Sequence, residues 1–384
     1  MAPPHRRSII LFCLANFFFW ASLYLYMPTF PVYLQSLGAS LSMVGAVVAA
    51  YAIPQVLLRI PIGIWADNLK RKKPLIAAGM VASALGALGL GGMTSPWLLF
   101  LARLTAGVGA AVWVVFTIYF TAYYPPEKKG RAIGLISFVQ SGALVVTTAS
   151  GGAIAQALNP RYTFFMAIPL ALISLAIFLF SREQPLERAE GFSWRSFSSV
   201  ATCPLLLTVS GMGILLQFTS SAGLFSFIPI YATSIGASSA DLGLLNMASL
   251  GFGMVGTLVA VRVWERSGYR MAIFLGALLA TVSTFTIPFI QDVPVLIATQ
   301  AVCGLGRSML MTSLMTLSIR DVAPKQQATA MGIYQAVYAV GMLAGPLVSG
   351  FLGDRLGLDS IFFLTALLSS LIMALAFLPA FSRK

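Results

Sequence analysis

Long apolar stretches alternate with short polar ones along the whole chain. Each apolar stretch has about 20 or more residues, which lets a helix cross a hydrocarbon layer roughly 30 Å thick. A strand of a membrane barrel needs only about 10 residues of alternating pattern, so these stretches predict helices. We expect twelve spans, near residues 9–34, 42–66, 74–93, 96–122, 131–156, 161–181, 204–233, 241–264, 270–290, 294–319, 328–353 and 360–381.

The chain repeats itself after 198 residues. PVYLQSLGASLSMVG at 31–45 and PIYATSIGASSADLG at 229–243 are identical at seven of fifteen positions. A repeat of this period indicates that the repeated unit is half of the protein. With six helices in each half, both halves start from the same side of the membrane. An axis along the membrane normal then relates them, as in transporters whose site lies between two halves.

One long polar interruption separates the two halves, from Ser181 to Ser199. Its mixed charges and lack of apolar periodicity are typical of an exposed linker. The sequence therefore predicts an all-α polytopic membrane protein with two pseudo-symmetric six-helix bundles. The N-terminal bundle covers 1–181, the linker 182–203 and the C-terminal bundle 204–384.

Composition and charge agree with a membrane protein. The chain is 58% hydrophobic and 9% charged, whereas soluble domains carry about 25% charged residues. Its net charge is +13. Nineteen of the 24 Lys and Arg residues fall at the two termini, in the linker, and in the loops and helix ends on the same side of the membrane as the termini. The positive-inside rule then places both termini in the cytoplasm of a cell-membrane protein. The basic residues serve topology, so we expect the lipid bilayer, and no nucleic acid, as a partner.

Few residues are suited to catalysis or metal binding. Cys13, Cys203 and Cys303 lie far apart, and the single histidine, His5, is in the N-terminal tail. We therefore expect no metal site and no cofactor, and the chain is not predicted to be an enzyme. Asp241 and Asp354 lie near the outer ends of predicted helices, where they are expected to act as caps.

Three arginines lie well inside the predicted spans. They are Arg59, Arg103 and Arg307, and no Asp or Glu lies at such depth with them. A charge inside a bilayer costs several kcal/mol unless it faces a cavity or a partner, so each is a functional candidate. Arg307 falls near the middle of its span, and we predict that it contacts the substrate. The alternative is that it bonds only carbonyl groups and holds two helices together.

Two stripes of polar and aromatic residues follow the helical spacing of four. One runs through Tyr51, Gln55 and Arg59, and the other comprises Asn16, Trp20 and Tyr24. Polar side chains aligned on one face of a membrane helix prefer an internal face. We predict that Gln55, Arg59 and the Asn16 stripe line a central cavity. The alternative is that the aromatic side chains serve packing.

The stretch GIWADNLKRKK at 63–73 resembles the Gly-x-x-x-Asp-Arg-x-Gly-Arg-Arg signature of the major facilitator superfamily of transporters. Gly63, Asp67, Arg71 and Lys72 match the signature, whereas other positions depart from it. The resemblance implies a loop that latches the two halves in one conformation and releases them in the other. Gly63 would permit close helix packing, and Asp67 would accept hydrogen bonds from a helix N-terminus. The alternative is an ordinary basic loop.

Two further segments resemble motifs of the same family. RLTAGVGAA resembles an Arg-x-x-x-Gly motif through Arg103 and Gly107, and the resemblance implies a role of this arginine in proton coupling. The alternative is an arginine bonded to neighbouring carbonyls. GPLVSG, with Gly345 and Pro346, resembles an exporter motif that normally lies in the fifth helix but occurs here in the eleventh. These residues predict a bendable helix between the halves.

The resemblance implies a secondary transporter that works by alternating access. We expect it to export a small organic molecule, with protons as the coupling ion that the family suggests. Uptake or exchange of an organic anion, bound by the membrane arginines, is the alternative within transport. A receptor or a lipid scramblase on the same fold is the alternative outside it.

The charge distribution generates a prediction about topology. A cysteine in the linker, Ser193→Cys, should resist an impermeant thiol reagent in intact cells and react once the cells are permeabilised. The wild-type chain, with its three cysteines, gives the background. Ready labelling of intact cells would reverse the orientation.

Overall fold

The computed structural model describes residues 3–69, 71–125, 128–184, 194–323 and 326–381. Within these ranges the chain forms helices joined by short turns, and no strand occurs. The predicted all-α class is confirmed. The helices are α1 (Pro3–Tyr24), α2 (Phe30–Ser36), α3 (Leu41–Ala50), α4 (Ala52–Asn68), α5 (Lys73–Gly92), α6 (Pro96–Ala111), α7 (Trp113–Thr121), α8 (Lys129–Ala157), α9 (Pro160–Leu179), α10 (Trp194–Ala201), α11 (Pro204–Ala222), α12 (Ile228–Ser234), α13 (Ser239–Thr286), α14 (Val293–Arg320), α15 (Gln327–Leu356) and α16 (Leu358–Leu375).

The predicted twelve crossings are present. Eleven helical segments of the described chain are long and apolar enough to cross a membrane. The longest, Ser239–Phe289, has 51 residues and contains Gly268 with φ 82° and ψ 167°. Such a backbone is not helical and suits glycine, which has no Cβ. The chain reverses at Gly268, so this segment supplies two crossings.

The spans predicted as continuous at 9–34 and 204–233 are interrupted at equivalent places. In the first half a turn separates α1 from α2, and in the second a π-helix, η2 (Gly223–Phe227), separates α11 from α12. Pro28 lies in the first interruption, and Pro229 lies in the first turn of α12, directly after the second. Proline lacks the N–H that a helix continuing from the preceding turn would use. Ser226 Oγ donates to the Ser221 carbonyl oxygen at 2.7 Å within the second interruption. The periodicity of apolar residues does not reveal such breaks.

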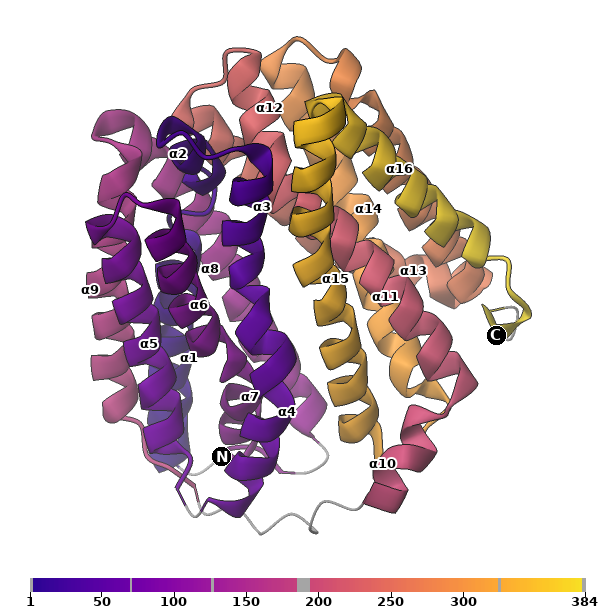
Figure 1. Ribbon diagram of the computed structural model, residues 1–384. Coiled ribbons are helices and arrows are strands. Elements are labelled where there is room, and N and C mark those ends of the chain that lie inside the picture. The colour runs from indigo at the N-terminus through magenta and orange to yellow at the C-terminus, as the bar shows by residue number, and fades with distance from the viewer. Residues whose placement is uncertain (1–2, 70, 126–127, 185–193, 324–325, 382–384) are drawn as a thin grey trace.

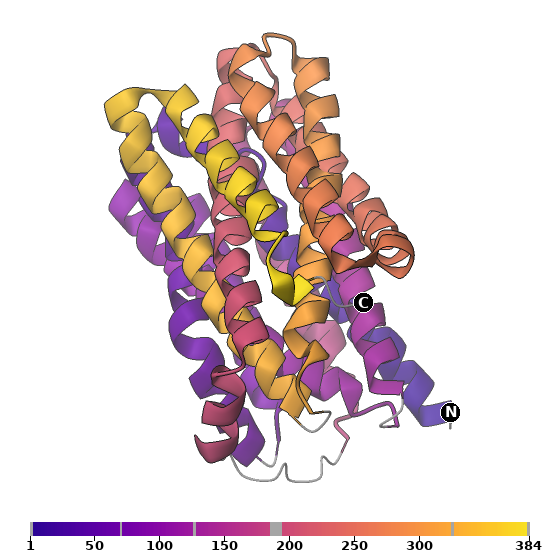
Figure 2. The same ribbon diagram turned by 90° about the vertical axis from the view of Figure 1, so that its right-hand side faces the viewer.

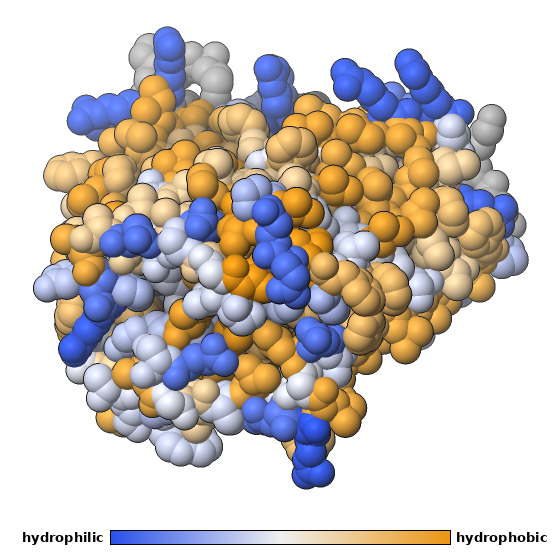
Figure 3. Space-filling model, turned by 90° about the horizontal axis from the view of Figure 1, so that it is seen from above, coloured by the Kyte–Doolittle hydropathy of each residue, from blue (hydrophilic) through white to orange (hydrophobic). Residues whose placement is uncertain are grey.

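The helices form two bundles that lie side by side (Figure 1). Helices α1–α9 build the first and α11–α16 the second, and α10 lies at one end, opposite α2 and α12. We call these the α10 end and the α12 end. Figure 2 shows the second bundle in front of the first. Seen from the α12 end, polar side chains gather on the face and apolar side chains cover the adjoining sides (Figure 3).

Each bundle has its own apolar core. Phe12 and Phe116 belong to the core of the first bundle, and Leu310 and Tyr334 to that of the second. Near the α12 end a third cluster contains residues of both bundles, such as Phe30 and Phe227. The bundles therefore share apolar packing at the α12 end.

Two helix crossings between the bundles involve glycine. A methyl group on Gly45 of α3 would lie 2.1 Å from the Pro346 carbonyl oxygen of α15. A methyl group on Gly152 of α8 would lie 2.6 Å from the Gly243 Cα of α13. Because real Cβ atoms do not approach so closely, these crossings require glycine. Gly45 and Gly243 end the two copies of the repeated stretch.

The close contact of Gly151 with the turn after α1 generates a prediction about stability. A methyl group there would lie 1.7 Å from the Leu25 carbonyl oxygen, so Gly151→Ala should lower the free energy of unfolding by about 1–3 kcal/mol. Gly142→Ala on the same helix is the control, since a methyl group there meets nothing within 4 Å. Thermal unfolding of the two purified variants measures the difference. Equal melting temperatures would contradict this account of the packing.

Candidate functional site

Arg307 lies near the middle of α14 and is half-buried. Its Nη2 donates to Ser249 Oγ of α13 at 2.7 Å. The two helices are in close contact here, because a methyl group on Gly304 would lie 1.9 Å from the Ser249 carbonyl oxygen. No carboxylate among the described residues pairs with Arg307. Its charge is held by one neutral hydroxyl, which leaves further guanidinium donors available to a ligand.

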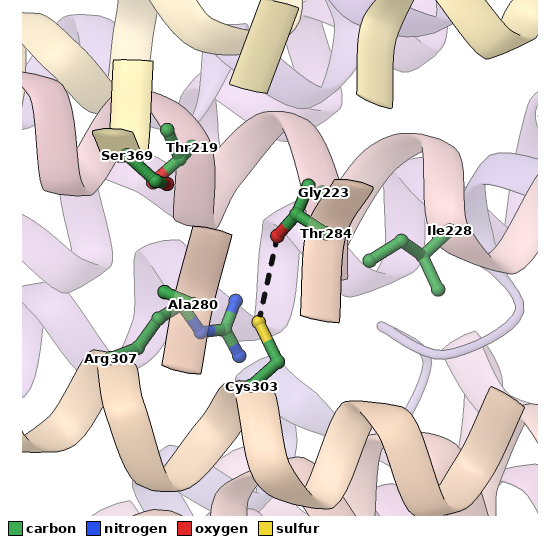
Figure 4. A pocket seen from close by; sticks show the side chains of 8 residues that line it. All are labelled: Thr219, Gly223, Ile228, Ala280, Thr284, Cys303, Arg307 and Ser369. Atoms are coloured by element: carbon green, nitrogen blue, oxygen red, sulfur yellow. Dashed lines mark hydrogen bonds between the residues drawn. The ribbon is translucent and has the colours of Figure 1, made fainter. Parts of the chain in front are cut away.

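Arg307 borders two cavities in the second bundle. The larger, of about 150 Å³, is lined by an apolar group and a polar group of side chains, namely Leu216, Leu224, Phe225, Leu250 and Met311, and Gln217, Ser220, Ser249, Arg307 and Ser308, with Gly304. The smaller, of about 10 Å³, has room for about one water molecule. Figure 4 shows the Arg307 guanidinium beside Cys303 in this smaller cavity. The larger cavity suits a small amphipathic group.

Aromatic side chains of the first bundle meet this region. The Tyr24 ring lies edge-on to the Phe225 ring, with centroids 5.9 Å apart, and Phe225 lines the larger cavity. Trp20 packs on Tyr24 at 5.9 Å and on Trp113 at 5.2 Å. Tyr24, predicted to line a cavity, thus reaches Phe225 at the edge of the cavity that Arg307 borders, and Trp20 packs on Tyr24.

Gln55 and Arg59 form a buried pair on α4. Arg59 Nη2 donates to Gln55 Oε1, and Gln55 Nε2 donates to the Tyr51 carbonyl oxygen at 3.0 Å. Arg59 is 8% exposed, and its Nε and Nη1 have no hydrogen-bond partner within the described chain. Unpaired buried donors are costly, so this guanidinium has unused capacity to bind an anionic or polar group.

Arg103 is enclosed by aromatic rings and is 2% exposed. Its Nη1 donates to the Tyr26 hydroxyl at 2.9 Å, and its Cζ lies 4.3 Å from the centroid of the Tyr51 ring. Gly107 brings Tyr51 close, since a methyl group there would lie 2.5 Å from the Tyr51 carbonyl oxygen. A hydroxyl and ring faces therefore stabilise the cation, where the sequence suggested carbonyls as the structural alternative. Its predicted role in coupling stays a prediction.

Asn16 makes its contact within the first bundle. Its Nδ2 donates to the Ile136 carbonyl oxygen of α8 at 3.1 Å, and the side chain is fully buried. Asn16 thus connects α1 with α8, whereas Tyr24, two turns further along α1, reaches Phe225 of the second bundle. The structure does not bring Asn16 to the cavity that Arg307 borders.

The loop after α4 contacts its own bundle. The Lys72 N–H donates to the Glu183 carboxylate, and Lys73 Nζ donates to the carbonyl oxygens of Leu179 and Ser181 at 2.6 and 2.8 Å. Arg71 is exposed, and the side chain of Asp67 lies outside the described residues. The contacts described for this loop do not reach the second bundle.

The expectation of close helix packing at Gly63 is wrong for this structure. A methyl group on Gly63 would meet only Val114 Cγ1, at 3.8 Å, which is an ordinary van der Waals distance. Close approach instead occurs at Gly345, where a methyl group would lie 2.4 Å from the Phe218 carbonyl oxygen of α11. Helix α15 continues through Pro346, whose carbonyl oxygen faces Gly45 of the first bundle.

Sequence reasoning missed two residues, Ser249 and Gln156, and the partner of a third, Asp354. Ser249 was not singled out, although it is the partner of Arg307, because its side chain gives no signal among many serines. Asp354 was expected to cap a helix, which is confirmed, but the helix belongs to the other bundle. Gln156, the residue 198 positions before Asp354, makes the equivalent contact. The repeat offset could have linked these two residues.

Comparisons with known proteins agree with this architecture. A model of the Major Facilitator Superfamily matches residues 12–220 and 210–383. The chain is 24% identical over 366 residues to Multidrug resistance protein 2 of Bacillus subtilis, covering 91% of this chain and 90% of that protein.

Two solved structures share the fold at low sequence identity. One is a bacterial homologue of the human lysosomal transporter Spinster in an inward-facing, unoccupied conformation, with a TM-score of 0.84, 15% identity, and 99% and 98% of the two chains covered. The other is the human organic anion transporter MFSD10, with a TM-score of 0.70, 18% identity, and 97% and 100% covered. At these identities the likeness shows the fold alone.

Proposed function

This chain belongs to the Major Facilitator Superfamily, and from that premise we propose that it is a secondary active transporter that exports a small organic molecule by alternating access. Members of this family are transporters and not enzymes, in agreement with the prediction from the sequence. The similarity to a multidrug resistance protein supports export. Protons are the proposed coupling ion, as the family suggests.

Arg307 is the observation that carries the proposal. It lies near mid-helix beside a cavity of about 150 Å³ whose lining is apolar on one part and polar on another. Its single described partner is the Ser249 hydroxyl. An amphipathic substrate would place its apolar body against Phe225 and Met311 and its polar or anionic group on the guanidinium. Gln55, Arg59, Tyr24 and Trp20 remain proposed contributors from the first bundle, whereas the buried Asn16 is bonded within that bundle.

We assign the structure to the inward-facing state of the transport cycle. Three hydrogen bonds between the two bundles lie at the α12 end. In this state the proposed latch of Gly63, Asp67 and Arg71 would be released. The α10 end would then face the cytoplasm of the cell membrane, in the orientation that the basic residues favour.

Transport of an organic anion is the second candidate. Arg103 and Arg307 lie inside candidate spans and Arg59 ends one, and no described carboxylate forms an ion pair with any of them. Arg59 has two guanidinium nitrogens without a hydrogen-bond partner among the described residues, and Arg307 borders the larger cavity. An anionic substrate would supply the missing countercharge.

Reconstitution in sealed liposomes tests the proposed function. We expect saturable flux of an amphipathic dye, with ethidium as a cationic probe and fluorescein as an anionic probe, driven by an imposed proton gradient. A protonophore should abolish accumulation. Preference for fluorescein would favour the organic-anion candidate. Lipid flipping without solute flux, or no flux of any probe, would contradict the proposal and favour a scramblase or receptor.

Arg307 variants test the binding site. Arg307→Gln should lose binding of the transported probe at least tenfold, because the charge is deleted, while Arg307→Lys should retain weak binding through its single ammonium group. Probe-induced thermal stabilisation measures the binding. Arg131→Gln, which removes an exposed charge from α8, is the matched control and should bind normally. If both Arg307 variants lose thermal stability while their folded fraction binds normally, Arg307 is structural.

A further inference from the structure

The two copies of the repeated stretch form equivalent structures at the α12 end. Gly38 and Gly236 have φ of 82° and 94°, and Ser40 and Ser238 are the N-cap residues of α3 and α13. Backbone N–H groups at the start of each helix donate hydrogen bonds to a side chain of the opposite bundle. The repeat thus builds two contacts between the bundles, related by the pseudo-symmetry.

The first contact joins α15 to α3 through a carboxylate. Asp354 Oδ1 accepts from the Leu41 N–H at 2.9 Å, and Oδ2 accepts from the Ser42 N–H at 2.9 Å. These N–H groups belong to the first turn of α3, where they have no partner within their own helix. The negative charge also lies at the positive end of the helix dipole. The contact therefore combines two charge-assisted hydrogen bonds with a charge–dipole attraction.

The second contact joins α8 to α13 through a neutral amide. Gln156 Oε1 accepts from the Ser239 N–H at 3.0 Å. Gln156 and Ser239 are the residues 198 positions from Asp354 and Leu41, so the two contacts occupy equivalent places. The second contact consists of one neutral hydrogen bond and lacks the charge of the first.

The difference lies in the origin of the carboxylate at each helix start. Helix α13 has its own, since Asp241 Oδ2 accepts from the Ser238 N–H at 2.9 Å in a capping box. The equivalent residue of α3 is Met43, and α3 contains no acidic residue. The anion at the start of α3 comes from Asp354, across the interface between the bundles. Each helix start has one carboxylate, but only α3 loses it if the bundles separate.

We propose that Asp354 is the charged half of an asymmetric clasp that holds the α12 end closed, so that opening this end is limited mainly by the α3–α15 contact. When the bundles separate there, α13 keeps Asp241, whereas α3 exchanges a carboxylate for water. The glycine crossings at Gly45 and Gly152 bring the helices close enough for both contacts. The role of the clasp in transport rests on the alternating access proposed above. Its existence is tested separately, by the distance between the bundles at the α12 end, which is measured without substrate.

The clasp is exposed, and no other charge competes for it from α3. Asp354 and its partners lie at the surface, where water weakens each hydrogen bond. The adjacent Arg355 lies over the Phe351 ring, with its Cζ 4.9 Å from the centroid. We therefore expect loss of the carboxylate to raise the ratio of open to closed molecules roughly tenfold, equivalent to about 1.4 kcal/mol.

Spin labels on the two bundles measure the opening. Thr94 and Gln291 are exposed residues in equivalent loops at the α12 end, and cysteines placed there, with the three native cysteines replaced, report the distance between the bundles. Pulsed electron paramagnetic resonance of the full chain should give one short-distance population in the parent protein. Asp354→Asn should add a longer-distance population. Gln156→Ala is the matched control and should shift the distribution several-fold less.

A transplanted carboxylate tests the charge itself. Met43→Asp gives α3 an acid of its own, which repels Asp354 and should also open the α12 end, without altering α15. Met43→Asp combined with Asp354→Gln reproduces the arrangement of the α13 contact and should return most molecules to the closed distance. Unchanged distances in Asp354→Asn, an equal shift in Gln156→Ala, or a double variant as open as Met43→Asp would each overturn the proposal. Unchanged distances would overturn the clasp even if a variant lost solute flux, because the lost flux would then concern the transport mechanism alone.

Discussion

The close approach of helices from opposite bundles is the contact on which the arrangement at the α12 end depends. Gly45 lies against Pro346, and Gly152 against Gly243, at distances that a side chain would prevent. In an apolar medium helices gain little from hydrophobic burial against each other, so contact between backbones and the hydrogen bonds near it supply the attraction. The contacts of Asp354 and Gln156 lie on the same pairs of helices. The bundles are consequently joined at one end, which an alternating-access mechanism requires of one state.

The buried arginines illustrate a second constraint, the cost of a charge without a counterion. The structure meets this cost in three ways. Arg103 is enclosed by the Tyr51 ring and bonded to the Tyr26 hydroxyl, which leaves it little capacity for a ligand. Arg59 is bonded to Gln55 and keeps two unpartnered nitrogens among the described residues. Arg307 has the Ser249 hydroxyl and borders a cavity. The number of guanidinium donors that already have a partner, more than the depth of the residue in the membrane, distinguishes a structural arginine from a candidate for ligand binding.

Pseudo-symmetry explains the backbone better than it explains the chemistry. Equivalent glycines, N-caps and helix interruptions recur after 198 residues, because equivalent helices of the two halves pack in the same way. The polar residues differ between equivalent positions, as Gln156 does from Asp354 and Met43 from Asp241. The two halves share their contacts and differ in their charges, so equivalent contacts need not be equally strong.

The sequence by itself determined the helical class and the twelve crossings, because the length of an apolar stretch follows directly from the thickness of the bilayer. It also identified Arg307 and the caps Asp241 and Asp354, because charged residues are rare in such a chain. Only the tertiary structure decided which helix Asp354 caps, that Ser249 holds Arg307, that Asn16 lies inside its own bundle and that Gly63 has open space beside it. Periodicity specifies the face of a helix on which a residue lies. The partner opposite that face depends on how whole helices from distant parts of the chain pack together, and a local pattern holds no information about that packing.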